Sequence, residues 1–462
     1  MKTSTWLSLV VLSALSLPIS SFAYYGARST EAILSYEAQA DLPWARGAAT
    51  VTAAQLNEDG ATRKRALSLL DAQVQHLMGI FQSASFQKSF GNPGVLGESY
   101  DIKFTSTAPS DETGRLIVKY RFKGKVAFGK DAFRNGDERA VPIALPLAAD
   151  RIYQQTMNAR GTVNLCTDPH YNTEGDFWYF WDPDQTGCPL RGVQEAPLVR
   201  LQGKLKRLDN TRASYPEYDR LYGGNGNGST LEISLFFGYI DEIESTRIPI
   251  RRDDAKTAFH YVEKELKARG FEISDTRDNF HEYRNGSTRA GINAWRVFER
   301  ETVALGKPLK VRVKMLLSDT DIGSKDDTFR IHLEDAFEHS DIVIYDGHSG
   351  LGANLDLASL PPIHFSKTKY QLYFFNGCSS YPYFRGQFFE KKGGSENVDI
   401  VTSGLPTYAN TSGPNAFTFM ERFLDGETKT YQKILQDLEA SNAEMGTYLT
   451  GVSGDEDNRW KP

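Results

Sequence analysis

The pattern of apolar and polar positions divides the chain into a strand-rich first half and a second half in which strands and helices alternate. Residues 61–82 carry apolar side chains at three- and four-residue spacing, which predicts one amphipathic helix. Residues 116–128 and 199–205 alternate between apolar and polar side chains, as half-buried strands do. We therefore expect a β-rich N-terminal domain that contains one helix.

Beyond residue 229 the pattern changes to that of an α/β domain. Strands are predicted at 231–240, 309–317, 342–345, 372–375 and 398–402, and the last three are short and almost wholly apolar. Helices are predicted at 253–269, 290–305, 327–338, 415–423 and 431–440. Apolar strands that alternate with helices are typical of a mainly parallel sheet covered by helices on both faces.

The boundary between the halves is best placed in the glycine- and asparagine-rich stretch 223–229, although a long hairpin tip is an alternative interpretation. This gives a β-rich domain over residues 24–228 and an α/β domain over residues 229–462. We expect the two to fold as separate domains, since 462 residues exceed the usual size of one.

The first 23 residues have the features of an export signal. Lys2 supplies a positive charge, residues 6–19 are mainly apolar, and residues 21–23 provide the small side chains that a signal peptidase requires. An uncleaved anchor helix is the alternative, but the stretch is short and Pro18 interrupts it. We expect a mature chain that begins at Tyr24 and is periplasmic or secreted from a bacterium.

Composition and charge exclude several classes of partner. The formal net charge is −6 and the basic residues are scattered along the chain, so nucleic acid is not an expected partner. No apolar run reaches the roughly 20 residues of a membrane span, so none is expected. Nothing in the sequence predicts the oligomeric state.

The three cysteines become informative in an oxidising compartment. Cys166 and Cys188 flank the polar loop 172–187 and are the natural disulfide pair. Cys378 then has no partner within the chain. A spare cysteine in an exported protein indicates a reactive thiol or an intermolecular disulfide, and the alternative is a buried, inert side chain.

Two of the predicted strands end in residues that carry chemistry. His348 lies in the motif YDGHSG, directly after the strand at 342–345, and Cys378 lies in FNGCSS, after the strand at 372–375. Ligands of open α/β sheets bind at the carboxyl ends of the strands. If these two strands are parallel neighbours, both side chains project from one edge of the sheet.

Such a pair predicts acyl transfer by a Cys–His dyad. A nearby imidazole increases the thiolate fraction of Cys378, and the same ring can later protonate a leaving amine. Backbone N–H groups of Cys378, Ser349 and Gly350 are candidates for stabilising the oxyanion of a tetrahedral intermediate. This chemistry requires neither a metal nor another cofactor.

The two motifs resemble those of the caspase, legumain and gingipain superfamily of cysteine peptidases, whose shared fold is the caspase-haemoglobinase sheet. The resemblance extends over about residues 231–445, and the 30-residue spacing between His348 and Cys378 is closest to that of the gingipains. It implies a nucleophilic Cys378, a general base and acid at His348, and a peptide or protein substrate. The family usually has glycine directly after the histidine, where this chain has Ser349.

The same region leaves two other interpretations open. Ser349 in GHSGL resembles the nucleophile of α/β-hydrolases, but Leu351 replaces the glycine of that motif, and His364 is the only histidine that follows. The second alternative is a non-catalytic binding or adhesion protein in which His348 and Cys378 only support the scaffold. We expect the wall of a substrate pocket, if the protein is a peptidase, in residues 403–412.

Two further patterns favour structure over function. The acidic pairs at 182–184 and 319–321 resemble calcium loops but lack the final glutamate, so they are predicted to be turns. The aromatic cluster 177–181 is expected to pack in the core beside the disulfide, with a binding patch for glycan or peptide as the alternative. No metal site is predicted.

Overall fold

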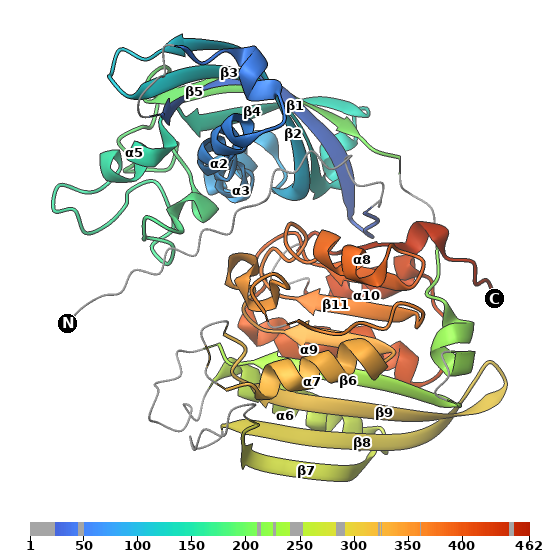
Figure 1. Ribbon diagram of the computed structural model, residues 1–462. Helices are drawn as coiled ribbons and strands as arrows, with labels where there is room; N and C mark the ends of the chain where they lie inside the picture. Colours follow the sequence, from blue (N-terminus) through green and yellow to red (C-terminus); the bar gives the residue numbers. More distant parts are fainter. Residues whose placement is uncertain are drawn as a thin grey trace. The chain divides into compact units, whose positions relative to one another are not determined.

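The computed structural model describes residues 24–44, 50–209, 214–224, 228–240, 253–282, 292–321, 324, 326–360, 362–442 and 448–462. The predicted signal peptide lies outside them, as does the middle of the glycine-rich stretch. The chain forms two compact units (Figure 1), of which the first is Thr30–Asp209 and the second comprises residues 24–29 and the chain beyond residue 209. This division falls ahead of the glycine-rich stretch.

The first unit is built on an antiparallel sheet with the strand order β2-β3-β1-β5-β4. Its strands are β1 (Ser29–Pro43), β2 (Gly94–Pro109), β3 (Arg115–Gly129), β4 (Glu138–Pro146) and β5 (Leu198–Arg207). Its helices are α1 (Ala53–Asn57), α2 (Ala61–Val74), α3 (His76–Gln82), α4 (Ala84–Phe90) and α5 (Ala149–Gln155). The β-rich character follows the sequence pattern, but the number of helices was underestimated.

The single helix predicted at 61–82 is divided into α2 and α3 at Gln75. The backbone of Gln75 stays in the right-handed helical region (φ −56°, ψ −29°), so the apolar face continues across the break. Gly79 of α3 lies against the loop of the aromatic cluster, where a Cβ atom would lie 2.0 Å from the backbone nitrogen of Trp181. Only glycine permits this close approach.

A disulfide joins Cys166 to Cys188, as predicted, and closes the loop that contains the aromatic cluster. Within that cluster Phe177, Tyr179 and Trp181 are buried. The ring of Trp181 packs edge-on against His76 of α3, at 5.1 Å between centroids. The prediction of core packing is therefore confirmed.

The second unit contains a mixed sheet of eight described strands in the order β13-β12-β11-β10-β6-β9-β8-β7. Neighbours from β12 to β9 run parallel, whereas β13, β8 and β7 pair antiparallel. The strands are β6 (Thr230–Gly238), β7 (Glu272–Phe280), β8 (Asn293–Ala304), β9 (Lys307–Ser318), β10 (Ile342–Asp346), β11 (Gln371–Asn376), β12 (Val398–Thr402) and β13 (Gly451–Ser453). The predicted α/β class is confirmed.

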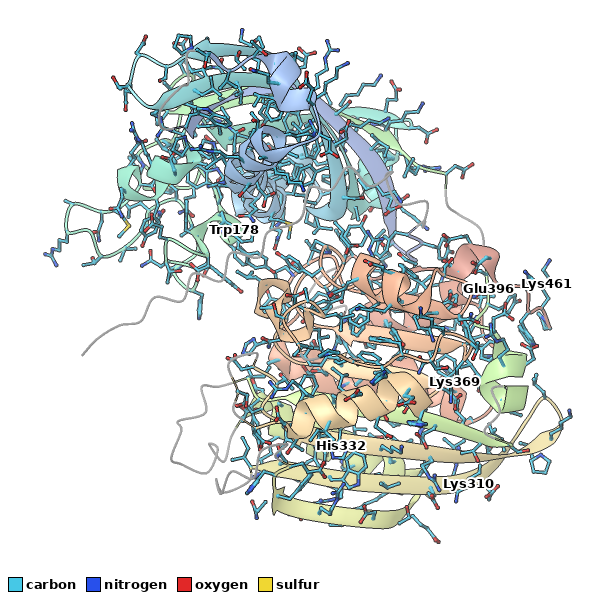
Figure 2. The ribbon with its side chains drawn as sticks, viewed as in Figure 1. Trp178, Lys310, His332, Lys369, Glu396 and Lys461 are labelled. Carbon is cyan, nitrogen blue, oxygen red and sulfur yellow. A yellow bond between two sulfur atoms is a disulfide. The ribbon has the colours of Figure 1, made fainter. Side chains whose placement is uncertain are left out.

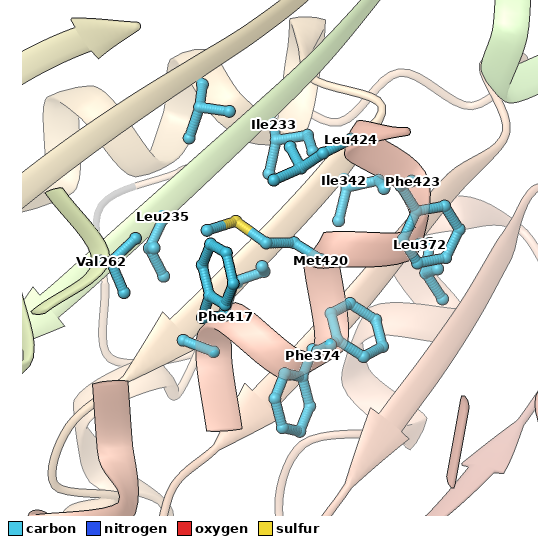
Figure 3. Close-up of a cluster of buried hydrophobic side chains, with 14 of the residues drawn as sticks. Ile233, Leu235, Val262, Ile342, Leu372, Phe374, Phe417, Met420, Phe423 and Leu424 are labelled. Atoms are coloured by element: carbon cyan, nitrogen blue, oxygen red, sulfur yellow. The ribbon is translucent and has the colours of Figure 1, made fainter. Parts of the chain in front are cut away.

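Helices cover both faces of this sheet. One face packs against α6 (Asp254–Ala268), α9 (Ser412–Leu424) and α10 (Tyr431–Ser441), in the apolar core shown in Figure 3. The other face packs against α7 (Thr328–His339) and α8 (Gly386–Lys392). His332 of α7, labelled in Figure 2, lies on that face. Its ring centroid is 4.5 Å from that of Trp295 on β8. None of the described helices is long and apolar enough to cross a membrane.

The helix predicted at 290–305 is wrong, because the described part of this segment forms strand β8. Along β8, Trp295 and Val297 face one core of the unit and Phe298 faces the other. The strand pairs with β9 from Ala294 to Ala304 and with β7 on its other side. The spacing of the apolar residues in this segment also fits a helix. The strand forms instead because its backbone pairs with both neighbours and its aromatic and β-branched side chains pack in the two cores.

The order of the strands places a topological switch point between β6 and β10. From β6 the chain builds β7, β8 and β9 on one side, and α7 then leads to β10 on the other side. In open α/β sheets, ligands bind at the carboxyl ends of the strands beside such a point. We therefore expect a ligand-binding site at the carboxyl ends of β6, β10 and β11.

The disulfide generates the first prediction. It closes a loop with a sequence separation of 22 residues, so replacing both Cys166 and Cys188 with Ser should lower the free energy of unfolding by about 3 kcal/mol, as measured by urea denaturation. Non-reducing peptide mapping should find these two cysteines joined and Cys378 free. A disulfide that includes Cys378 in the folded monomer would contradict this arrangement.

The second prediction concerns Asp455, a buried residue near the C-terminus to which Ser214 donates a hydrogen bond. Burial raises its pKa to about 7, so the folded state holds a proton that the unfolded state releases near pH 4. Stability from this group is therefore lost as the pH rises from about 4 to 7. Asp455→Asn should remove that loss, leaving the variant up to about 4 kcal/mol more stable than the wild type at pH 8.

Urea denaturation at pH 5 and pH 8 measures this difference. The control is Glu338→Gln, which removes an exposed carboxylate of α7 that does not contribute to the raised pKa of Asp455. An equal pH dependence in Asp455→Asn and in the wild type would show that the burial of this carboxyl does not govern the profile.

Candidate active site

The register of β10 and β11 brings the two predicted motifs together. The last paired residues of these parallel strands are Asp346 and Asn376. Beyond them the chain continues through Gly347 and Gly377 to the histidine and the cysteine. A Cβ atom on Gly377 would lie 3.0 Å from the carbonyl oxygen of Gly347, so the two turns are in direct contact. Both motifs therefore leave the sheet side by side.

His348 is exposed, and one ring nitrogen is held by the backbone at the end of β6. Its Nε2 lies 2.7 Å from the carbonyl oxygen of Ile240. A carbonyl can only accept, so Nε2 is the donor and carries the proton. In the neutral ring this leaves Nδ1 as the acceptor, which is the form required of a general base.

The backbone around His348 is fixed as well. Its carbonyl oxygen accepts hydrogen bonds from Tyr345 Oη at 2.6 Å and from Asn354 Nδ2 at 3.0 Å. Tyr345 is fully buried and also contacts Thr320 Oγ1, at 3.0 Å. The loop that carries the histidine is thus tied to side chains from three segments of the chain.

Cys378 is a free cysteine with a partly exposed side chain. Its Sγ lies 3.5 Å from the carbonyl oxygen of Thr407 and 4.0 Å from Thr407 Oγ1. Burial of the sulfur raises the pKa of the thiol, so this environment favours the protonated form. In the described chain no hydrogen bond joins Sγ to the ring of His348.

An acid–amide pair, which the sequence patterns did not single out, lies at the ends of the two strands. Asp346 is buried, and its Oδ2 accepts a hydrogen bond from Asn376 Nδ2 at 2.7 Å. Burial raises the pKa of Asp346 to about 6. The charge of Asp346 in turn contributes to the raised pKa of Cys378. The signal was present in the sequence, because both motifs share a polar residue and a glycine before the reactive side chain.

Strained backbone is concentrated at this edge. Among the described residues five non-glycine residues have positive φ, and three of them are Leu351 (53°), Ser379 (47°) and Leu449 (51°). Leu351 follows the histidine motif, and Ser379 directly follows the cysteine. Leu449 follows Tyr448, whose carbonyl oxygen accepts the amides of Gly404 and Leu405 in the segment that borders the cysteine. Such conformations persist only where surrounding contacts impose them, and they gather at functional sites.

The residues proposed for the oxyanion site lie in the same turns. Ser349 is buried and precedes a short 3-10 turn, η5 (Gly350–Leu355), and Gly350 has a φ of 56°. Its left-handed conformation is one that glycine adopts without strain. The burial of Ser349 does not favour the alternative in which this residue is the nucleophile. His364, the histidine of that alternative, is exposed, and its backbone amide donates a hydrogen bond to the side chain of Glu334 on α7.

The segment 403–412, predicted as a pocket wall, borders the cysteine. Besides the contact of Thr407 with the sulfur, the amide of Ser379 donates to the carbonyl of Leu405 at 3.1 Å. The side chain of Tyr408 is 52% exposed, an unusual fraction for a large aromatic residue. Tyr408 directly follows Thr407, the residue that contacts the sulfur, and its exposed aromatic ring is a surface suited to packing against another side chain.

The acidic pairs form turns, as predicted. The amide of Asp321 donates to Asp319 Oδ1 at 3.1 Å, and that of Asp184 donates to Asp182 Oδ1 at 3.1 Å. In the part of the chain that the structure covers, no group of three or more His, Cys, Asp or Glu side chains has the geometry to hold a metal ion.

Comparison of the chain with known proteins does not identify its family. No protein-family description matches the sequence, and no curated protein matches it either.

Proposed function

We propose that the protein is a cysteine peptidase of the caspase, legumain and gingipain type, with Cys378 as the nucleophile and His348 as the base. The observation that carries the proposal is the register of β10 and β11, two parallel neighbours after which both residues follow at the same edge of the mixed sheet. The protonated Nε2 of His348 supports it, because that tautomer leaves Nδ1 free to accept a proton.

The reaction follows from these roles. His348 Nδ1 accepts the proton of the Cys378 thiol, and the thiolate attacks the carbonyl carbon of a peptide bond. The tetrahedral intermediate collapses as the imidazolium protonates the leaving amine, which yields an acyl-enzyme. Water, deprotonated by the same imidazole, then hydrolyses the thioester. Backbone amides of Cys378, Ser349 and Gly350 are the proposed donors to the oxyanion.

A second candidate function has an observation in its favour. The thiol of Cys378 donates to the carbonyl of Thr407 and has a raised pKa, as a packed structural cysteine would. A binding or adhesion protein on a peptidase scaffold would retain such an arrangement. The two candidates differ in whether the residues 403–412 move aside and expose the sulfur to a substrate.

The third prediction is that the mature protein cleaves peptides only when Cys378 is intact. Cleavage of a peptide library under reducing conditions should fall by at least about 1,000-fold in Cys378→Ala, because the acyl-enzyme cannot form. The matched control is Ser349→Ala, which removes the rival nucleophile and should retain measurable cleavage. Activity that survives in Cys378→Ala but disappears in Ser349→Ala would refute the cysteine mechanism.

The fourth prediction uses the pH dependence of alkylation. Iodoacetamide reacts with the thiolate, so the midpoint of the rate against pH reports the pKa of Cys378. Asp346→Asn removes a buried negative charge beside the sulfur and should shift the midpoint to lower pH. Asp335→Asn, on the surface of α7, is the control and should leave the midpoint unchanged.

The wild-type midpoint separates the two candidate functions. A midpoint below about pH 7 indicates a thiol activated by His348, whereas one above about pH 9 indicates a packed cysteine. An Asp346→Asn variant with an unchanged or higher midpoint would contradict the electrostatic coupling between this carboxyl and the thiol.

A further inference from the structure

The carbonyl that holds His348 belongs to a segment that is itself held by a buried carboxylate. Ile240 lies just beyond the end of β6, and its amide donates to Asp253 Oδ2 at 3.1 Å. The other oxygen, Asp253 Oδ1, accepts the amide of Ala255 at 2.8 Å and so caps the first turn of α6. Asp253 is 1% exposed.

These contacts form a continuous path from the start of α6 to the imidazole ring. The carboxylate fixes the amide of Ile240, and the carbonyl of the same residue accepts the proton of His348 Nε2 at 2.7 Å. A helix cap requires only one oxygen, which Ser, Thr or Asn could also supply. The second oxygen of Asp253 is directed to a strand end, which capping alone does not require.

We propose that Asp253 is a positioning residue for the reaction, which sets the tautomer and the orientation of His348 through the backbone of Ile240. The inference rests on the proposed function, since it assigns a role within the same dyad. It differs from a direct Asp–His contact in that no carboxylate oxygen of the described residues touches the ring. The backbone carbonyl is neutral, so it orients the imidazole without the stabilisation of the imidazolium that a paired carboxylate would add.

Two substitutions separate positioning from helix capping. Asp253→Ser retains a hydroxyl that can accept the Ala255 amide, but its single short oxygen cannot also reach the Ile240 amide. Thr430→Ala is the matched control, because Thr430 Oγ1 caps α10 of the same unit by accepting the Lys433 amide at 3.1 Å. The control removes a cap without touching the path to His348.

The expected result is a fall in kcat of about 10- to 100-fold in Asp253→Ser, with KM nearly unchanged, because the base is misplaced while the pocket is intact. Thr430→Ala should keep kcat within about twofold. Thermal unfolding checks that both variants are folded. A kcat for Asp253→Ser equal to that of the control would overturn the proposal.

A second readout does not depend on activity. In full-length protein with ¹⁵N-labelled histidine, the neutral ring of His348, assigned with His348→Gln, should show a protonated Nε2 in the wild type and in Thr430→Ala. In Asp253→Ser the ring should populate both tautomers. A tautomer shift in a protein that cleaves no peptide would uphold the role of Asp253 and refute the proposed function. An unchanged tautomer would overturn the role of Asp253.

Discussion

The parallel pairing of β10 with β11 is the constraint on which the candidate site depends. Because Asp346 is paired with Asn376, both strands end at the same level and both glycine turns leave the sheet together. A shift by one residue would send the side chains of β11 to the opposite face and separate the two motifs. The register is specified by burial on both faces, since every residue of β10 and β11 is buried.

The sequence predicted the buried strands best, for a physical reason. The runs 342–345 and 372–375 consist of aliphatic and aromatic residues at every position because helices cover both faces of the sheet, so neither face calls for polar residues. The segment at 290–305 failed because its apolar positions fit both a helix and a strand, and its pairing partners lie elsewhere in the chain. Strand β7 was missed because it lies at an edge of the sheet and is almost wholly exposed.

The candidate site was only partly predictable because its members differ in how they are positioned. His348 and Cys378 follow strands, so their placement needs only the strand ends and a parallel order. Thr407 contacts Cys378, and Asp253 accepts the amide of Ile240. Both contacts join different segments of the chain, so the local sequence pattern does not predict them. Asp253 has a visible signature as a helix cap, but that signature says nothing about its second oxygen.

The two residues of the proposed dyad, His348 and Cys378, are prepared to different degrees in this structure. The imidazole of His348 already has the tautomer that a base requires, held by a chain of hydrogen bonds that ends in a helix cap. The thiol of Cys378 is still held by the carbonyl of Thr407, and burial and a nearby carboxylate favour its neutral form. Exposing the sulfur to water would lower the cost of forming the thiolate, because burial is the largest cause of its raised pKa. In the proposed dyad it is therefore the thiol that requires a change of environment before reaction, because the histidine already has the tautomer of a base.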